Sequence, residues 1–179
     1  MSHLAPPMRI LLLSDTHGYL DDDILAHAAE ADELWHAGDV GGGDVLERLK
    51  DRVATVRAVY GNIDGGAVRR DWPEDALWES AGLNVYMTHI GGYPGRYNPR
   101  ARAVLDAHPG VGLFICGHSH ILKVMPDRRR GLLHMNPGAC GQHGFHRIRT
   151  MLRFGIEAGR VVRPEVVELG RRGELRSRE

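Results

Sequence analysis

The stretch Val111-Gly-Leu-Phe-Ile-Cys-Gly-His-Ser-His120 decides how the rest of the chain is interpreted. Its first six residues form an apolar run with the length and composition of a buried strand. Gly117 ends the run, and two histidines follow with one residue between them. If the chain stays extended past the glycine, His118 and His120 point to the same side, because side chains alternate along a strand. Such a pair can present two imidazole nitrogens to a metal ion, and the open alternative is a polar turn.

The same design recurs at four other places. Apolar runs lead into Asp, His or Asn beside a glycine at Ser14-Asp-Thr-His-Gly18, Ala37-Gly-Asp-Val40, Gly61-Asn-Ile-Asp64 and His89-Ile-Gly-Gly92. In open α/β sheets, ligands gather at the carboxyl ends of the strands. We therefore expect the polar residues of these segments to line one site.

The composition is that of an ordinary globular domain. The 179 residues are 42% hydrophobic, which is enough for one substantial core. Lys and Arg number 23, as do Asp and Glu, so no global charge bias indicates nucleic acid or an anionic membrane as a partner. No apolar stretch approaches a membrane span, and residues 1–7 lack the apolar core of a signal peptide. We expect a cytoplasmic protein with a loose leader (1–7), one domain (8–169) and a charged tail (170–179); a homo-oligomer is possible.

The first 60 residues predict alternating strands and helices. Strands are expected at residues 8–14, 34–36 and 54–60, with one helix beginning near Asp21 and another over Asp44–Lys50. This β-α-β-α-β order favours a parallel sheet with right-handed crossovers.

The second half predicts a partly antiparallel arrangement. Hairpins are expected around Ala81-Gly82 and Glu157-Ala-Gly159, and a helix over residues 100–107. Residues 121–125 are expected to return antiparallel to the strand that ends at Cys116, and residues 131–135 to form a further strand. Together the elements indicate two packed sheets with helices outside.

Seven residues at the predicted strand ends can bind divalent metals: Asp15, His17, Asp39, Asn62, His89, His118 and His120. They are too many for one tetrahedral site and suit two divalent ions bridged by a shared carboxylate. A closed structural zinc site would use cysteine, which is absent from the set. Each residue alone has a structural alternative, such as a helix cap, a turn former or a core histidine. One metal site explains all seven together more simply than seven separate structural roles do.

The series Asp15-x-His17, Gly38-Asp39, Gly61-Asn62-x-Asp64, His89 and Gly117-His-Ser-His120 resembles the calcineurin-like metallophosphoesterases. Among them it resembles the small, single-domain bacterial and archaeal phosphodiesterases. The resemblance implies an α/β fold, a four-layer α-β-β-α sandwich of two mixed sheets flanked by helices. Carried over by motif, one ion would be held by Asp15, His17 and His120. The other would be held by Asn62, His89 and His118, with Asp39 as the bridge.

The resemblance also implies an activity. It indicates a hydrolase of phosphoric esters, a phosphodiesterase rather than a phosphomonoesterase, in which hydroxide activated by two divalent ions attacks phosphorus in line. Manganese is the first expectation for the ions, with iron, zinc or nickel as alternatives. The rival function is a non-catalytic interaction scaffold, because a retromer subunit that resembles this superfamily kept the fold for protein binding.

One position departs from the pattern of many superfamily members. Ile63 occupies the slot where those members carry a histidine credited with protonating the leaving group. A general acid is worth about 10²–10⁴-fold in rate, but small members of the group also lack it. Asn62 is also a candidate contact for a phosphoester substrate, as are Arg96 and Tyr97 in the loop after His89, with a solvated arginine as the alternative. His36 is a candidate for positioning the ligands; His134, His143 and His146 have no predicted place.

Overall fold

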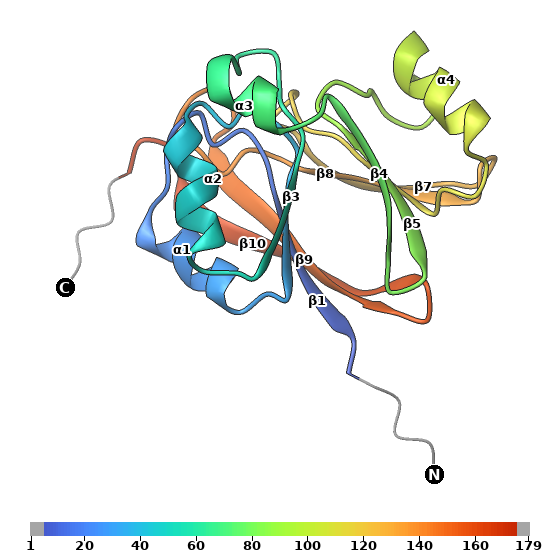
Figure 1. Ribbon diagram of the computed structural model, residues 1–179, viewed down its shortest axis with the longest axis horizontal. Coiled ribbons are helices and arrows are strands. Elements are labelled where there is room, and N and C mark those ends of the chain that lie inside the picture. The colour runs from blue at the N-terminus through green and yellow to red at the C-terminus, as the bar shows by residue number, and fades with distance from the viewer. Residues whose placement is uncertain (1–5, 175–179) are drawn as a thin grey trace.

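Two five-stranded sheets packed face to face, with helices outside them, make up the fold (Figure 1). The computed structural model describes residues 6–174. Sheet A contains, in spatial order, β10 (Arg160–Arg171), β9 (Ile148–Glu157), β1 (Met8–Leu13), β2 (Glu33–His36) and β3 (Thr55–Ala58). Sheet B contains β4 (Asp75–Ser80), β5 (Leu83–Thr88), β6 (Leu113–Ile115), β8 (Leu132–Pro137) and β7 (Leu122–Asp127). The predicted α/β sandwich of two mixed sheets is confirmed.

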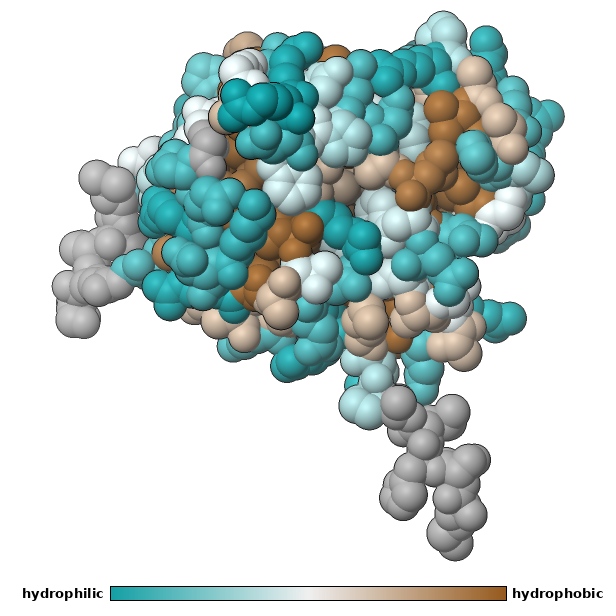
Figure 2. Space-filling model, in the orientation of Figure 1, coloured by the Kyte–Doolittle hydropathy of each residue, from teal (hydrophilic) through white to brown (hydrophobic). Residues whose placement is uncertain are grey.

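The parallel half of sheet A follows from its alternating sequence. β1, β2 and β3 are parallel neighbours, joined by α1 (Asp22–Ala29) and α2 (Gly43–Lys50). The helix α1 begins where the Asp21 carboxylate accepts the Ile24 N–H at 3.0 Å, a cap that satisfies one free donor of the first turn. Ile24 of α1 and Leu46 of α2 pack with Leu11 of β1 in one buried cluster on the outer face of sheet A. The outward surface over these two helices is mostly hydrophilic (Figure 2).

The long hairpin of β9 and β10 completes sheet A. The two strands pair antiparallel around Glu157-Ala-Gly159, as the sequence predicts. β9 also pairs antiparallel with β1, with Ile10 opposite Phe154. The first strand of the chain therefore lies in the middle of the sheet, between β2 and β9.

Sheet B confirms the predicted hairpin of β4 and β5 and corrects another pairing. The strand at residues 121–125 does not return along the strand that ends at Cys116. Instead β6 pairs parallel with β5 and β8, and β7 pairs only with β8, at the edge. The physical reason is burial: β8 is almost wholly buried and suits the interior, whereas β7 contains Lys123 and Pro126, which suit an edge.

The remaining helices differ in how well the sequence predicts them. α4 (Pro99–Ala107) lies where it is expected, and its Leu105 packs with Tyr86 and Phe114 on the outer face of sheet B. α3 (Gly66–Asp71) was not predicted, because a six-residue helix with only Val68 buried leaves no apolar periodicity.

A third cluster fills the space between the sheets and includes Leu12, Trp35, Val85 and Ile115. None of the described helices has the length and hydrophobicity needed to cross a membrane. β10 continues to Arg171, two residues into the predicted tail. Residues 1–5 of the predicted leader and residues 175–179 of the tail lie outside the described part of the chain.

Candidate metal centre

The seven predicted ligands follow the carboxyl ends of five strands. Sheet A contributes Asp15 and His17 after β1, Asp39 after β2 and Asn62 after β3, and sheet B contributes His89 after β5 and His118 and His120 after β6. These strand ends belong to the parallel parts of both sheets, where ligand sites of α/β proteins lie.

The first cluster joins three of these residues. Ligand atoms of Asp15, His17 and His120 all lie within 4.8 Å of one another. Asp15 Oδ1 is 3.1 Å from His120 Nε2 and 3.9 Å from His17 Nε2. Two donors that bind one ion at about 2.1 Å are themselves about 3–3.5 Å apart, so this spacing suits a shared cation.

The second cluster contains Asp39, His89 and His118, whose ligand atoms also lie within 4.8 Å of one another. Asp39 Oδ1 is 3.2 Å from His89 Nε2. The other oxygen, Oδ2, is 3.7 Å from Nε2 of His17, which belongs to the first cluster. The carboxylate of Asp39 therefore presents one oxygen to each cluster, an arrangement in which a carboxylate can bridge two ions. Asn62 lines a small cavity with His89, beside this second cluster.

Three buried donor atoms of the clusters have no hydrogen-bond partner within the described residues. They are Asp15 Oδ1, His17 Nε2 and His89 Nε2. An unpaired buried polar atom costs about 1–3 kcal/mol, so a fold that retains three of them side by side needs a reason. Nitrogen and carboxylate donors in this mixture fit borderline divalent ions, and one cation in each cluster would satisfy all three atoms.

The other polar atoms of these side chains are occupied. Asp15 Oδ2 accepts the Ser14 hydroxyl at 2.6 Å and the His118 N–H at 3.1 Å. His89 Nδ1 lies 2.7 Å from the carbonyl oxygen of Ala37, which can only accept, so Nδ1 carries the proton. These bonds leave Asp15 Oδ1 and His89 Nε2 free as lone-pair donors, which is how ligand-orienting contacts act in metal sites.

The ligand loops have an unusual backbone. Asp15, His17, Asp39, His118 and His120 all have positive φ, between 47° and 66°. This conformation costs a non-glycine residue about 1 kcal/mol or more, and it persists only where surrounding bonds enforce it. Here the Asp15 N–H donates to Gly38 O and the His17 N–H to Asp39 O, both at 3.0 Å. The loops after β1 and β2 thus hold each other in place.

Two glycines allow the donors to approach closely. A Cβ on Gly38, whose φ is +95°, would lie 2.6 Å from Nδ1 of His89. A Cβ on Gly61 would lie 2.1 Å from Oδ1 of Asp39. Both distances are well inside van der Waals contact, so the motifs need glycine at these positions.

Asp64 and His36 lie behind the ligand loops. The two oxygens of Asp64 accept N–H groups from Val40 at 3.1 Å, Gly41 at 2.8 Å and Gly61 at 2.8 Å. His36 accepts the Gly38 N–H through Nδ1 at 3.1 Å, and its Nε2 lies 2.9 Å from the Thr16 hydroxyl. Burial lowers the pKa of His36 to about 4, so its ring is neutral and accepts that bond at physiological pH. Both residues fix the ligand loops without belonging to either cluster.

The charges of the site favour a cation between the aspartates. Burial lowers the pKa values of His17 and His118, so both rings are neutral donors at physiological pH. Burial acts in the same direction on His89, but the neighbouring carboxylates of Asp39 and Asp15 outweigh it, and the pKa of His89 rises. The nearby His89 lowers the pKa of Asp39 against the effect of burial. The carboxylates therefore attract positive charge to the point where the two clusters meet.

Two histidines to which the sequence assigned no role, His143 and His146, also lie beside candidate ligands. The ring of His143 lies 4.9 Å from the ring of His17, and that of His146 lies 5.2 Å from that of His120. Both follow Asn136-Pro-Gly138, where the Asn136 amide donates to Gly117 O at 2.9 Å and so supports the loop of the paired histidines. Spacing could not reveal this proximity, because the loop that contains them follows a different strand from any ligand.

The two substrate contacts predicted in the loop after His89 differ from one another in their surroundings. The Tyr97 hydroxyl donates to Asp127 Oδ2 at 2.6 Å, and its ring packs against Phe114. Burial raises the pKa of this hydroxyl above its ordinary value. Arg96 is exposed, and neither residue lines the cavity that contains Asn62 and His89. Their contact with a substrate stays a prediction.

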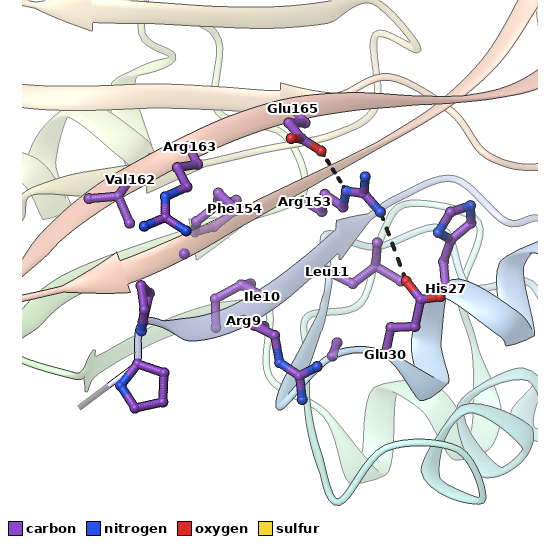
Figure 3. Close-up of a pocket in the computed structure, with 14 residues that line it drawn as sticks. Arg9, Ile10, Leu11, His27, Glu30, Arg153, Phe154, Val162, Arg163 and Glu165 are labelled. Carbon is purple, nitrogen blue, oxygen red and sulfur yellow. Dashed lines mark hydrogen bonds and ion pairs between the residues drawn. The ribbon is translucent and has the colours of Figure 1, made fainter. Parts of the chain in front are cut away.

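A larger cavity, of about 520 Å³, lies beside α1 and the β9–β10 hairpin (Figure 3). Arg9, His27 and Arg163 line it, together with Arg153, which pairs with Glu165 at 2.7 Å and Glu30 at 3.9 Å. None of the seven predicted ligands lines this cavity. It is therefore separate from the metal centre.

Comparison with known proteins agrees with the fold and the motifs. Residues 8–159 match the calcineurin-like phosphoesterase superfamily domain. No protein of curated function has a matching sequence. Among solved structures with the same fold, a Thermotoga maritima protein is 24% identical with a TM-score of 0.66, and the match covers 90% of this chain and 99% of that one. An archaeal phosphodiesterase is 21% identical with a TM-score of 0.62, over 89% of this chain and 100% of that one. Vps29 of Entamoeba histolytica complexed with zinc is 17% identical with a TM-score of 0.68, over 90% of this chain and 99% of that one. Because the family match covers most of the chain, the protein belongs to the calcineurin-like phosphoesterase superfamily.

Proposed function

We propose that this protein is a phosphodiesterase that works with two divalent metal ions, manganese foremost. The observation that carries the proposal is the pair of donor clusters joined by Asp39, whose two oxygens face different clusters. Membership of the phosphoesterase superfamily supports the same reaction class.

Some residues of the site would hold the metal ions, and others orient those ligands. Two divalent ions, when bound, supply charge that grips one phosphoryl group and activates water for in-line attack. Asp15, His17 and His120 would hold one ion, and Asn62, His89 and His118 the other, with Asp39 between them. Because Ser14 and Ala37 fix the orientation of Asp15 and His89, little reorganisation is needed when the ions bind.

Position 63 bears on the choice of substrate. Ile63 is 47% exposed, and its N–H donates to Asp39 Oδ1 at 3.1 Å. Its side chain offers no proton to a leaving group. Esters whose leaving group departs as a stable anion, such as aryl diesters, should therefore react best.

The alternative function is an interaction scaffold, and one observation favours it: several solved structures of the same fold are Vps29 proteins. The donor set argues against it. A scaffold has no physical need for three unpaired buried donor atoms or for five ligand positions with left-handed backbone.

Turnover separates the two functions, whereas metal binding alone does not, because one Vps29 structure is itself complexed with zinc. Purified protein would be loaded with Mn, Fe, Zn or Ni in turn and assayed with bis(p-nitrophenyl) phosphate, with metal content measured in the same samples. We expect two ions per chain and turnover that is lost in Asp39→Asn. Two bound ions with no turnover under any of the four metals would favour the scaffold.

A further inference from the structure

A small cavity beside the second cluster contains an arginine that belongs to none of the sequence motifs. The cavity has a volume of about 160 Å³, and Tyr60, Asn62, Arg69 and His89 are among its lining residues. Asn62 and His89 are the candidate ligands of the second ion. Arg69 comes from α3, the helix that the sequence did not predict.

The guanidinium of Arg69 is held by the turn that carries Asn62. Its Nε–H donates to the carbonyl oxygen of Asp64, and its Nη2 donates to that of Gly61 at 3.4 Å. The group also lies over the ring of Tyr60, with Cζ 4.5 Å from the ring centre. Of the five N–H donors of a guanidinium, these two bonds use two, so three remain for a ligand.

The charge of Arg69 is not compensated locally. No ion pair joins it to a carboxylate anywhere in residues 6–174, whereas Arg100, the other arginine of the cavity, pairs with Glu74 and Asp75. Glu74 also accepts a hydrogen bond from the Tyr60 hydroxyl at 2.9 Å, so its carboxylate is already bound to Tyr60 and Arg100. Arg69 is therefore the free positive charge of the cavity.

The size of the cavity brings its two ends within reach of one anion. Asn62 and His89 line the same cavity as the guanidinium, and a volume of about 160 Å³ holds a small anion such as a phosphoryl group between them. Guanidinium groups bind phosphate oxygens through paired, charge-assisted hydrogen bonds.

We infer that Arg69 binds an anionic oxygen of the substrate's phosphoryl group, as a protein-supplied cation beside the metal centre. The inference rests on the proposed function, since it takes the anion to be the substrate's scissile phosphoryl group. It assigns to Arg69 the phosphate contact that the sequence suggested for Arg96.

Binding of inorganic phosphate tests this without turnover. Isothermal calorimetry would compare Mn-loaded wild type, Arg69→Gln, Arg69→Lys and the matched control Arg70→Gln, after metal content and melting temperature are measured for each. Arg70 is the next residue of α3, and its side chain is 70% exposed and pairs with Asp71. We expect Arg69→Gln to weaken phosphate binding about 10- to 100-fold, Arg69→Lys to retain part of it, and Arg70→Gln to change it less than about twofold.

Two results would overturn the inference. One is unchanged phosphate affinity in Arg69→Gln at full metal loading. The other is loss of bound metal in both Arg69 variants, which would make Arg69 a structural support of the Asn62 turn. If phosphate binding depends on Arg69 but the wild type hydrolyses no diester, the proposed function fails and the anion site stands.

Discussion

Asp39 is the residue on which both ligand clusters depend. Its oxygens lie 3.2 Å from His89 Nε2 and 3.7 Å from His17 Nε2, so it is the only one of the seven candidates placed to serve two ions through two atoms. His118, by contrast, belongs to one cluster. A carboxylate between two cations also offsets their repulsion, which no imidazole can do.

We therefore expect Asp39→Asn to lose metal and activity more completely than His118→Asn. Asparagine is the matched replacement at both positions, because it tolerates the positive φ of 52° at Asp39 and 66° at His118. Elemental analysis after dialysis gives metal per chain. Equal or greater retention of metal in Asp39→Asn would contradict the bridging role.

A second prediction concerns the missing proton donor. Because Ile63 is 47% exposed, an imidazole fits there, and Ile63→His should speed hydrolysis of alkyl diesters more than of aryl diesters. Asp64, the next residue in the chain, cannot orient the new ring, because backbone N–H groups already occupy its carboxylate. The measurement is the dependence of rate on leaving-group pKa for both proteins at full metal loading. A wild-type dependence already near zero, with chemistry limiting, would mean that another group supplies the proton.

Some residues of the candidate site can be predicted from the sequence, and others cannot. Asp15, His17 and the paired histidines are recognisable because each lies beside a glycine at the end of an apolar run, and the glycines are sterically required, as Gly38 shows. Arg69 and His143 approach the site through a short helix and a loop, whose positions depend on tertiary packing. No local spacing encodes that packing.

At the scale of elements, burial sets the strand order that local sequence leaves open. The sequence locates every strand, but the pairing of β6 with β8 rather than β7 depends on which strand is better buried from both sides. Hairpins such as β4–β5 and β9–β10 are predictable because a short turn fixes the pairing. A parallel neighbour is joined through a long connection, so the sequence leaves its partner undetermined.

The interior position of β8 has a consequence for stability, because it buries His134. The side chain is 1% exposed, its Nδ1 has no hydrogen-bond partner within the described residues, and burial lowers its pKa to about 4. The unfolded chain binds this proton below about pH 6.5. Between these values the unfolded state holds more protons, so stability falls as the pH falls, and the loss is complete near pH 4.

His134→Leu should therefore flatten the pH dependence of unfolding between about pH 6.5 and 4. The difference in slope from wild type should approach about 1.4 kcal/mol per pH unit for one proton. Urea unfolding with chelator present measures the free energy of unfolding at each pH. The contributions of the candidate metal ligands cancel in the comparison, because both proteins contain them. His108→Gln, which removes an exposed histidine, is the control. Parallel curves for wild type and His134→Leu would show that His134 is not the group responsible.

At the scale of the whole molecule, the candidate metal centre lies where the two sheets meet. Sheet A supplies Asp15, His17, Asp39 and Asn62, and sheet B supplies His89, His118 and His120. An ion bound by Asp39 and His89 would therefore link the sheets through their loops. Binding to the folded state alone must raise its stability by mass action.

Removing metal should accordingly lower the melting temperature. At free metal about 100 times the dissociation constant, one ion adds about 2.7 kcal/mol, which corresponds to roughly 5–10 °C for a chain of this size. Scanning fluorimetry over a range of Mn concentrations, with chelator as the zero point, measures the shift. Asp39→Asn should show a much smaller shift, and equal shifts in both proteins would mean that metal binds elsewhere.

The central position of β1 affects how the protein is made. β1 is flanked by β2, which follows it closely, and by β9, which begins only at Ile148. While residues 14–147 are being translated, one edge of this apolar strand has no partner, and an open apolar edge invites pairing with other chains. Release of the β9–β10 hairpin from the exit tunnel closes that edge. Until β9 is made, the nascent chain therefore exposes an apolar strand edge of the kind that chaperones protect.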